Sequence, residues 1–348
     1  MNFSFRPFDL RFKHTWLIAS SLDQGGKNIY PAAFVELRDA DGVVGYGESA
    51  PSSRYRENVA SCLAFFQRVD AARLSFDDVP GSMAYVESLS AGDFSPKGAI
   101  NIALLDGAAK KARKPLHDFL GLKFAEGRHV TSFTIGIDTP DVIRRKVQEA
   151  EEFPILKIKV GAPGDDENLA AVRAVAPDKI LRVDANEGWK TKEEALRRLE
   201  WLARDPKIEF VEQPMPAGTP TADFVWLKER SPLPLVADES YLHASDVTLC
   251  AECFHGVNVK LCKAGGVSRG FEALTAARQA GLKTMLGCMS ESSILTAAGA
   301  HLAALTDWLD LDGNLLINND PFQGITTDRG VMSFARATEP YGLRVTPR

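Results

Sequence analysis

The sequence predicts an α/β protein, built from a parallel β/α barrel and a preceding α+β domain. Short apolar runs rich in β-branched residues begin at eight points along the chain, near Ser132, Leu156, Ile180, Phe210, Leu235, Val257, Thr284 and Trp308. Their starts lie 22 to 30 residues apart, and amphipathic helical patterns fill the intervals. This regular alternation predicts a parallel barrel, and the lack of a glycine-rich phosphate-binding turn disfavours a doubly wound open sheet.

Residues 1–125 have the pattern of an antiparallel meander followed by helices. Apolar and polar residues alternate in three stretches, at residues 3–12, 33–38 and 43–48. The turn-forming sequence Asp39-Ala-Asp-Gly separates the last two stretches. Helical periodicity follows from Val59 and again from Ile100. We therefore expect an α+β domain ahead of the barrel.

The barrel pattern stops after Trp308-Leu-Asp-Leu-Asp-Gly, and no clear eighth helix follows in the sequence. We expect the tail, residues 314–348, to return to the first domain. The predicted organisation is thus an N-terminal α+β domain at residues 1–125, completed by that tail, and a barrel domain at residues 126–313.

Composition limits the classes of function. Of 348 residues, 41 are basic and 46 acidic, and the net charge of −5 does not favour binding to nucleic acid or membranes. The sequence has no uncharged apolar run long enough to span a bilayer and no hydrophobic signal segment at Met1. Five scattered cysteines indicate a reducing interior, and the Cys250–Cys253 pair has no second pair to complete a zinc site. We expect a cytoplasmic enzyme or binding protein.

Charged residues end six of the eight predicted strands. In chain order they are Lys157 and Lys159, Asp184, Glu212, Asp238, Lys260, and Asp310 with Asp312. The carboxyl ends of the strands of a parallel barrel meet at one mouth, where catalytic residues lie. These side chains are therefore expected to share one site.

Asp184, Glu212 and Asp238 end three successive strands and are predicted to bind a metal ion. A single acid at a strand end is more often a helix cap or a solvated charge. Three carboxylates that converge repel one another unless a cation holds them, and an all-oxygen ligand set suits Mg²⁺ better than zinc. Glu239 competes with its neighbour for this role, but we expect it to point away from Asp238, toward the barrel exterior or a neighbouring strand.

The lysines are predicted to be the bases. Lys157 and Lys159 share one face of a strand, and Lys260 ends the sixth strand, opposite the second. A nearby cation and a neighbouring ammonium lower the pKa of a lysine toward that of a general base, so we expect Lys157 to lower the pKa of Lys159. Lys263 lies beyond the strand end and is the weaker choice. A Schiff-base lysine is an alternative, but it leaves the three carboxylates unexplained.

A base on each side of a metal-bound ligand suits one class of reaction. Removing the proton α to a carboxylate leaves two negatively charged oxygens, which Mg²⁺ stabilises. If Lys159 removes the proton and Lys260 returns it, or the reverse, the stereocentre inverts. The residues therefore predict a 1,1-proton transfer, which is a racemisation or an epimerisation.

These motifs resemble those of the enolase superfamily, in its muconate cycloisomerase (mandelate racemase/muconate lactonizing enzyme-like) subgroup. The matching segments are Ala99–Lys111 with Pro115–Gly121, Lys157-x-Lys159, Asp184-Ala-Asn, Glu212-Gln-Pro, Asp238-Glu-Ser and Asn258-Val-Lys260. The resemblance covers essentially the whole chain and is greatest to dipeptide epimerases of the L-Ala-D/L-Glu type. It implies a modified TIM barrel, (β/α)7β, with an α+β capping domain, and one Mg²⁺ per subunit.

The motif Asp310-Leu-Asp312 distinguishes dipeptide epimerases from the other members of this subgroup. Both acids are expected to face the mouth, opposite the metal ligands, and in the dipeptide epimerases such a pair holds the α-ammonium of the N-terminal residue. Thr134 resembles a family residue that contacts the dipeptide backbone. A solvent-facing acid pair is the alternative. Other activities of the subgroup, those of o-succinylbenzoate synthases, N-acylamino acid racemases and cycloisomerases, stay open.

The family resemblance implies that loops of the capping domain contact the substrate side chain. Here these are residues 21–28 and 51–56, which contain Lys27, Arg54 and Tyr55. Family members that act on Ala-Glu place a cation in the first loop, and Lys27 stands where an arginine is expected. Cys288 and Met289, with Ser290, are expected to line the pocket.

We therefore expect Mg²⁺-dependent epimerisation of an L,L-dipeptide at the α-carbon of its C-terminal residue. The Ala-Glu dipeptide of peptidoglycan recycling is the candidate substrate. A solute-binding barrel without catalysis is disfavoured, because every catalytic position is filled. Whether the chain forms a homo-oligomer is left open.

Overall fold

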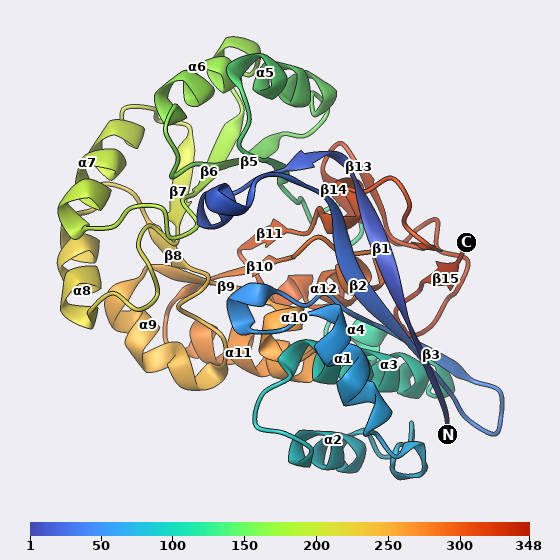
Figure 1. Cartoon of the computed structure of the whole chain (residues 1–348). Coiled ribbons are helices and arrows are strands. Elements are labelled where there is room, and N and C mark those ends of the chain that lie inside the picture. The colour runs from blue at the N-terminus through green and yellow to red at the C-terminus, as the bar shows by residue number, and fades with distance from the viewer.

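An antiparallel sheet begins the chain and packs against helices (Figure 1). The structure, a computed structural model, describes residues 1–348 apart from the side chain of Gln24. The sheet has the order β1–β2–β3, with β1 at Asn2–Trp16, β2 at Lys27–Arg38 and β3 at Val44–Ser49. Four helices follow: α1 (Val59–Gln67), α2 (Val79–Ser88), α3 (Phe94–Lys111) and α4 (Leu116–Phe119). The meander and the helices predicted from Val59 and Ile100 are confirmed.

Helix α3 lies between this sheet and the barrel, and residues 95–109 are buried. On the sheet side it packs against Gly45 and Gly47 of β3. A Cβ atom at either glycine would collide with a carbonyl oxygen of α3, so only glycine allows this close packing. On the barrel side, Asn101 of α3 donates a hydrogen bond to Ser268 Oγ at 2.8 Å. This packing fixes the sheet relative to the barrel.

The barrel forms as predicted. In the described part of the chain its strands are β4 (Phe133–Ile135), β5 (Ile155–Lys159), β6 (Ile180–Asp184), β7 (Ile208–Glu212), β8 (Leu235–Ala237), β9 (Gly256–Lys260), β10 (Lys283–Gly287) and β11 (Trp308–Asp310). They are parallel and neighbour one another in chain order. A bridge between Thr131 and Leu309, and a hydrogen bond from Ser132 N to Leu309 O at 3.1 Å, join the first strand to the last.

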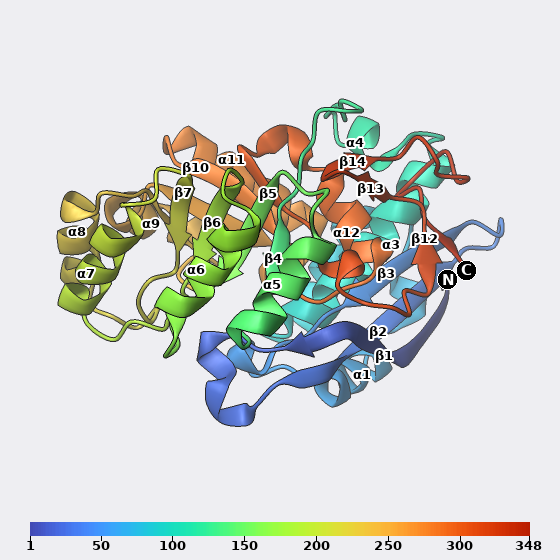
Figure 2. The same ribbon diagram turned by 90° about the horizontal axis from the view of Figure 1, so that it is seen from above.

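Helices surround these strands (Figures 1 and 2). They are α5 (Pro140–Glu149), α6 (Asp165–Val175), α7 (Lys192–Leu202), α8 (Thr221–Arg230), α9 (Val247–Cys253), α10 (Leu261–Ala264), α11 (Val267–Gln279) and α12 (Ser293–Ala300). The short 3₁₀ helices are η1 (Ala19–Gln24), η2 (Ser53–Tyr55), η3 (Ala71–Arg73), η4 (Ala244–Asp246), η5 (Ala303–Leu305) and η6 (Gly313–Leu315). After β11 the chain forms η6 in place of a long helix, so the predicted (β/α)7β barrel is confirmed.

The tail contacts the N-terminal sheet and helices. It contains β12 (Phe322–Gln323), β13 (Thr326–Asp328), β14 (Val331–Ser333) and β15 (Thr346–Pro347). The ring of Phe322 packs on those of Phe34 and Tyr46, each with a centroid distance of 5.4 Å. The backbone N–H of Leu343 donates to Asp106 Oδ1 at 2.7 Å. The first and last segments of the chain therefore pack together beside the barrel.

Two carboxylates link the N-terminal lobe, formed by strands β1–β3 and helices α1–α4, to the barrel mouth. Glu48, at the end of β3, accepts hydrogen bonds from the N–H and the hydroxyl of Ser292, at the start of α12. Glu187, in the loop after β6, accepts two hydrogen bonds from Arg54 of η2. These links hold the N-terminal segments over the mouth. Among the described residues, no helix combines the length and the apolar character needed to cross a bilayer.

Candidate active site

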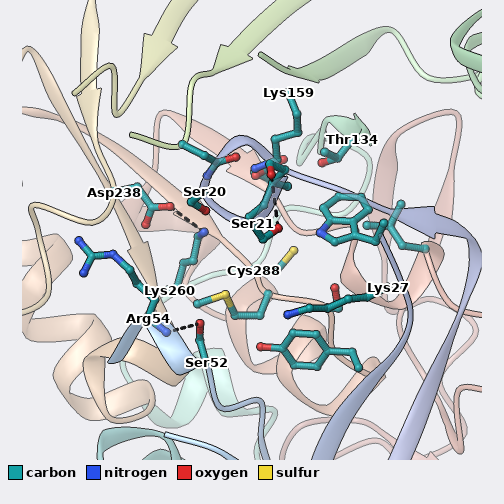
Figure 3. Close-up of a pocket in the computed structure, with 18 of the residues that line it drawn as sticks. Ser20, Ser21, Lys27, Ser52, Arg54, Thr134, Lys159, Asp238, Lys260 and Cys288 are labelled. Carbon is teal, nitrogen blue, oxygen red and sulfur yellow. Dashed lines mark hydrogen bonds and ion pairs between the residues drawn. The ribbon is translucent and has the colours of Figure 1, made fainter. Parts of the chain in front are cut away.

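A cavity of about 360 Å³ lies at the carboxyl ends of the barrel strands, covered by the segments around η1 and η2 (Figure 3). Most of the predicted site residues line it: Lys27, Arg54, Tyr55, Thr134, Lys157, Lys159, Asp238, Lys260, Cys288, Met289, Asp310 and Asp312. Asp184 and Glu212 are fully buried beside them. The predicted strand ends therefore do meet in one place.

Asp184, Glu212 and Asp238 form a compact carboxylate cluster. Each offers an oxygen within 4.8 Å of the other two. The parallel register pairs Asp184 with Glu212, and Asp238 follows the last residue of β8. Asp184 Oδ1 accepts from Asn186 N at 2.9 Å, and Glu212 Oε1 accepts from Asn258 Nδ2 at 2.7 Å. The other oxygen of each lies beside a lysine: Asp184 Oδ2 is 2.6 Å from Lys159 Nζ, and Glu212 Oε2 is 2.7 Å from Lys157 Nζ. This oxygen-only set fits a hard divalent cation.

The charges in this cluster are strongly coupled. Burial, with the charge of Asp184, raises the pKa of Glu212 to about 7. Burial also acts to raise the pKa of Asp184, but the ammonium groups of Lys159 and Lys157 outweigh it and lower that pKa to about 2. Such opposed shifts are typical of carboxylates crowded into one buried site.

Lys157 is buried among carboxylates, with 1% of its surface exposed. Its Nζ lies 2.7 Å from Asp310 Oδ2, 2.7 Å from Glu212 Oε2 and 3.1 Å from Asp184 Oδ2. Burial disfavours its charge, but these three acids raise its pKa well above the usual value. Lys157 is therefore a fixed positive charge inside the acid cluster.

Lys159 and Lys260 approach the cavity from opposite sides of the barrel. Their strands, β5 and β9, are four positions apart in the strand order. Lys159 Nζ lies 2.6 Å from Asp184 Oδ2, and Lys260 Nζ lies 2.7 Å from Asp238 Oδ2. Figure 3 shows both side chains reaching into the cavity. The predicted two-sided arrangement is present.

The pKa of Lys260 differs from the sequence-based expectation. Burial acts to lower it, but the adjacent carboxylate of Asp238 outweighs burial and raises it well above the usual value. The expectation of a lowered lysine pKa included the positive charge of a bound metal ion, which disfavours the ammonium form. The carboxylates alone act in the opposite direction.

Lys263 contacts Asp238 rather than the cavity. From α10, its buried ammonium donates to both the carbonyl oxygen and Oδ1 of Asp238. Lys260 donates to the other carboxylate oxygen, Oδ2. Lys263 thus holds a predicted metal ligand in place, a contact that the sequence analysis missed.

The prediction for Glu239 is wrong. Glu239 does not point to the barrel exterior but lines the cavity next to Asp238. Strand β8 ends at Ala237, and the N–H groups of Asp238 and Ser240 both donate to Gln213 Oε1. This turn ends the alternation of side chains that the prediction assumed. Burial and the charge of Asp238 raise the pKa of Glu239 to about 8.

The two acids of the Asp-Leu-Asp motif have different partners. Asp310, the last residue of β11, accepts from Ser132 Oγ at 2.6 Å and from Lys157 Nζ at 2.7 Å. Asp312 lies beyond the strand and accepts from Thr134 N at 2.6 Å. Within the described residues, no Lys, Arg or His side chain pairs with Asp312. Burial and the charge of Asp310 raise the pKa of Asp312 to about 6.

The segments from the N-terminal lobe close the other side of the cavity. Lys27 is the first residue of β2 and points into the cavity in Figure 3. Arg54 lines it too, but its guanidinium forms a two-pronged ion pair with Glu187, at 2.7 and 2.8 Å. Burial raises the pKa of the neighbouring Tyr55, which stays neutral. Lys27 is therefore available to bind a ligand, whereas Arg54 is already paired with Glu187.

A family model described as enolase C-terminal domain-like matches residues 142–340. A curated L-Ala-D/L-amino acid epimerase of Pedosphaera parvula is 59% identical over 345 residues, which cover 99% of each chain. The chain belongs to the enolase superfamily. An L-Ala-D/L-Glu epimerase of Bacteroides thetaiotaomicron is 37% identical, covering 95% of this chain and 84% of that protein.

Solved structures of enolase-superfamily members have the same fold. A dipeptide epimerase from Cytophaga hutchinsonii, complexed with Mg and the dipeptide D-Ala-L-Val, matches with a TM-score of 0.89 and 27% identity. The match covers 99% of this chain and 95% of that chain. The similarity in fold to that relative therefore extends over nearly the whole chain.

Several residues of this enolase-superfamily site were not singled out by the sequence analysis. Ser132, bound to Asp310, lies two residues before Thr134, so strand periodicity places both on one face. Trp16, Tyr30 and Leu316 line the cavity from β1, β2 and the segment after η6. No motif marks them, because they reach the site through the packing of distant segments.

Proposed function

We propose that this protein is a Mg²⁺-dependent dipeptide epimerase that inverts the α-carbon of the C-terminal residue. One observation carries the proposal: Lys159 and Lys260 lie on opposite sides of one cavity, beside three carboxylates and an acid without a cationic partner, Asp312. The names of the relatives from Pedosphaera parvula and Bacteroides thetaiotaomicron support it.

Asp184, Glu212 and Asp238 are the proposed ligands of Mg²⁺. One oxygen of each lies within 4.8 Å of the others, and all three side chains are buried. Bound Mg²⁺ would offset the negative charge that develops on the substrate carboxylate as the α-proton leaves. The Mg-containing relative from Cytophaga hutchinsonii supports this choice of ion.

Lys159 and Lys260 are the proposed acid and base. One lysine, in its neutral form, removes the α-proton from one face of the substrate, and the opposite lysine, as an ammonium, donates a proton to the other face. The product then has the inverted configuration: one proton has moved from the substrate to the first lysine, and another has moved from the second lysine to the substrate. Lys157 stays charged as a partner of the carboxylates, and Lys263 holds Asp238 in place.

Asp312 is the proposed partner of the substrate's α-ammonium. It is buried, its carboxylate faces the cavity, and an ammonium would supply the cation that Asp312 lacks. Thr134, whose N–H donates to Asp312, is the proposed contact of the backbone of the N-terminal residue. An N-acylamino acid racemase or o-succinylbenzoate synthase acts on substrates without this ammonium, so Asp312 favours a dipeptide.

Lys27 is the proposed contact of the C-terminal side chain, and it favours an acidic one. On this basis we propose Ala-Glu, of peptidoglycan recycling in the cytoplasm, as a substrate. Residues 1–125 with the tail 314–348 would act as the capping domain, and residues 126–313 as the catalytic barrel. The cap would exclude water from the closed site.

Incubation with dipeptides in D₂O tests the proposal. The purified protein with Mg²⁺ is expected to incorporate deuterium at the α-carbon of the C-terminal residue of L-Ala-L-Glu or a related dipeptide, measured by mass spectrometry. Chiral chromatography should show the D-isomer accumulating with the label. Absence of exchange from a library of L-Ala-L-Xaa dipeptides would contradict the proposal, and exchange only in N-acylated amino acids would favour the racemase.

A further inference from the structure

A second cavity, of about 200 Å³, lies directly behind the first. Three residues line both cavities and so form the wall between them: Trp16, Thr134 and Leu316. Each comes from a different part of the chain, namely the end of β1, strand β4 and the segment after η6. The two spaces are therefore neighbours that share these side chains.

The wall is built next to Asp312, the proposed ammonium partner. The N–H of Leu316 donates to the carbonyl oxygen of Asp312 at 3.2 Å, and Thr134 N donates to its carboxylate at 2.6 Å. Lys13 N donates to Leu316 O at 2.9 Å and so holds β1 against this turn. A substrate ammonium on Asp312 would thus bring the first α-carbon of the dipeptide close to the wall.

Packing holds the indole of Trp16 in position. It stacks on Phe12 with a centroid distance of 5.7 Å and an interplanar angle of 8°. On the barrel side Trp16 meets Gly136, where an added Cβ would lie 3.5 Å from the indole ring. The wall is therefore a packed part of the structure rather than a loose side chain.

Aromatic rings line the interior of the second cavity, and charges lie at its edge. The rings belong to Phe12, Phe133 and Phe153, and the last two pack with a centroid distance of 4.7 Å. His14 and Glu149 form an ion pair beside them, joining β1 to α5. An apolar cavity of about 150 Å³ can hold a benzene molecule, so this space suits an aromatic or branched side chain.

We propose that Trp16 and Leu316 restrict the N-terminal residue of the substrate to a small side chain. The second cavity is then a separate compartment that would accept a large N-terminal side chain once the wall is opened. This inference rests on the proposed epimerase function and adds to it the residues that select the first residue of the dipeptide.

The test compares L-Ala-L-Ala with L-Phe-L-Ala, using the Mg²⁺-loaded enzyme and α-deuterium incorporation. The wild type is expected to favour L-Ala-L-Ala in kcat/KM by about 10-fold or more. Leu316→Ala is expected to shift the ratio of the two kcat/KM values toward L-Phe-L-Ala by about 10-fold or more. Trp16→Leu opens the wall from the other lobe and is expected to act in the same direction.

Leu315→Ala is the matched control. Leu315 lines the second cavity but not the first, so its truncation enlarges the second cavity without opening the wall. The kcat/KM ratio of this variant is expected to equal that of the wild type. A shift as large as that of Leu316→Ala would overturn the wall as the selecting element.

The outcomes separate this inference from the function on which it rests. If the wild type epimerises L-Phe-L-Ala as well as L-Ala-L-Ala, the inference fails while the function stands, and this comparison needs no variant. If folded Leu316→Ala and Trp16→Leu proteins keep the wild-type ratio, the inference also fails. If the wild type epimerises no dipeptide, the proposed function itself fails.

Discussion

Lys157 Nζ lies 2.7 Å from Asp310 Oδ2, so the first acid of the Asp-Leu-Asp motif already has a cationic partner within the protein. Ser132 binds the other oxygen of the same carboxylate. Asp310 therefore joins the first, second and last barrel strands around a buried charge, and Asp312 is left to bind a ligand. Two acids in one short motif thus have separate tasks.

Substitution of each acid should give a different kinetic result. Asp312→Asn is expected to raise KM for L-Ala-L-Glu by about 10- to 100-fold, because a charge-assisted hydrogen bond to the ammonium is lost. Asp310→Asn should lower kcat, because Lys157 loses a partner and shifts among the carboxylates. Steady-state kinetics check both. Equal effects of the two substitutions on KM and kcat would contradict this division.

Removal of Mg²⁺ should abolish activity, and loss of one carboxylate, that of Glu212, should strongly weaken the affinity for Mg²⁺. Dialysis against EDTA is expected to stop α-proton exchange, and added Mg²⁺ to restore it. Glu212→Gln should weaken Mg²⁺ binding by about 100-fold or more, because a buried anionic ligand is lost. Isothermal titration calorimetry measures the affinity, with exposed Asp166→Asn as the control. Unchanged affinity in Glu212→Gln would exclude Glu212 as a ligand.

A buried histidine pair should make stability depend on pH. His117 Nδ1 lies 2.8 Å from His301 Nδ1, and His301 Nε2 lies 3.1 Å from Leu343 O. Burial, with the charge of His117, lowers the pKa of His301 to about 3. The folded state therefore disfavours protonated His301. Its contribution to stability is present above the unfolded pKa and is lost as the pH falls from about 6.5 toward 3.

The variant His301→Gln isolates this contribution. Between pH 7.5 and 5.5, the wild type should lose about 1.4 kcal/mol more unfolding free energy than the variant. Urea denaturation at the two pH values measures the difference, and groups common to both proteins cancel. Parallel pH profiles of the two proteins would show that His301 does not titrate in this way.

Close packing of the sheet on α3 should make Gly47 sensitive to substitution. Gly47→Ala places a Cβ against the carbonyl oxygen of Ala99 and should destabilise the protein by about 3 kcal/mol, through displacement of α3. Gly218→Ala is the control, because an added Cβ there meets no atom within 4 Å. Thermal unfolding compares the two, and equal melting temperatures would argue against the close contact.

The barrel and the charged ends of its strands could be predicted because both depend on local patterns. The strands begin within two residues of the predicted starts, and Asp184, Glu212 and Asp238 meet because parallel neighbours share their register. The orientation of Glu239 could not be predicted in this way, since it depends on hydrogen bonds from the turn to distant Gln213. Local periodicity does not reveal such contacts.

The partners of Asp310 and the wall of the cavity could not be predicted for a related reason. Asp310 meets Ser132 only because the last strand closes onto the first, across 178 residues of sequence. Trp16 and Leu316 reach the site because the N-terminal lobe and the tail pack on the barrel. Sequence periodicity predicts elements and faces, whereas these contacts require the assembled fold.

The central claim, that one lysine acts on each face of the substrate, is tested most directly with Lys159→Ala and Lys260→Ala. Each variant is incubated in D₂O with Mg²⁺ and either L-Ala-L-Glu or L-Ala-D-Glu, and α-deuteration is followed by mass spectrometry. Neither variant should epimerise, and each should retain exchange with only one isomer, a different isomer for each lysine. Normal epimerisation by either variant, or exchange of the same isomer by both, would contradict the claim.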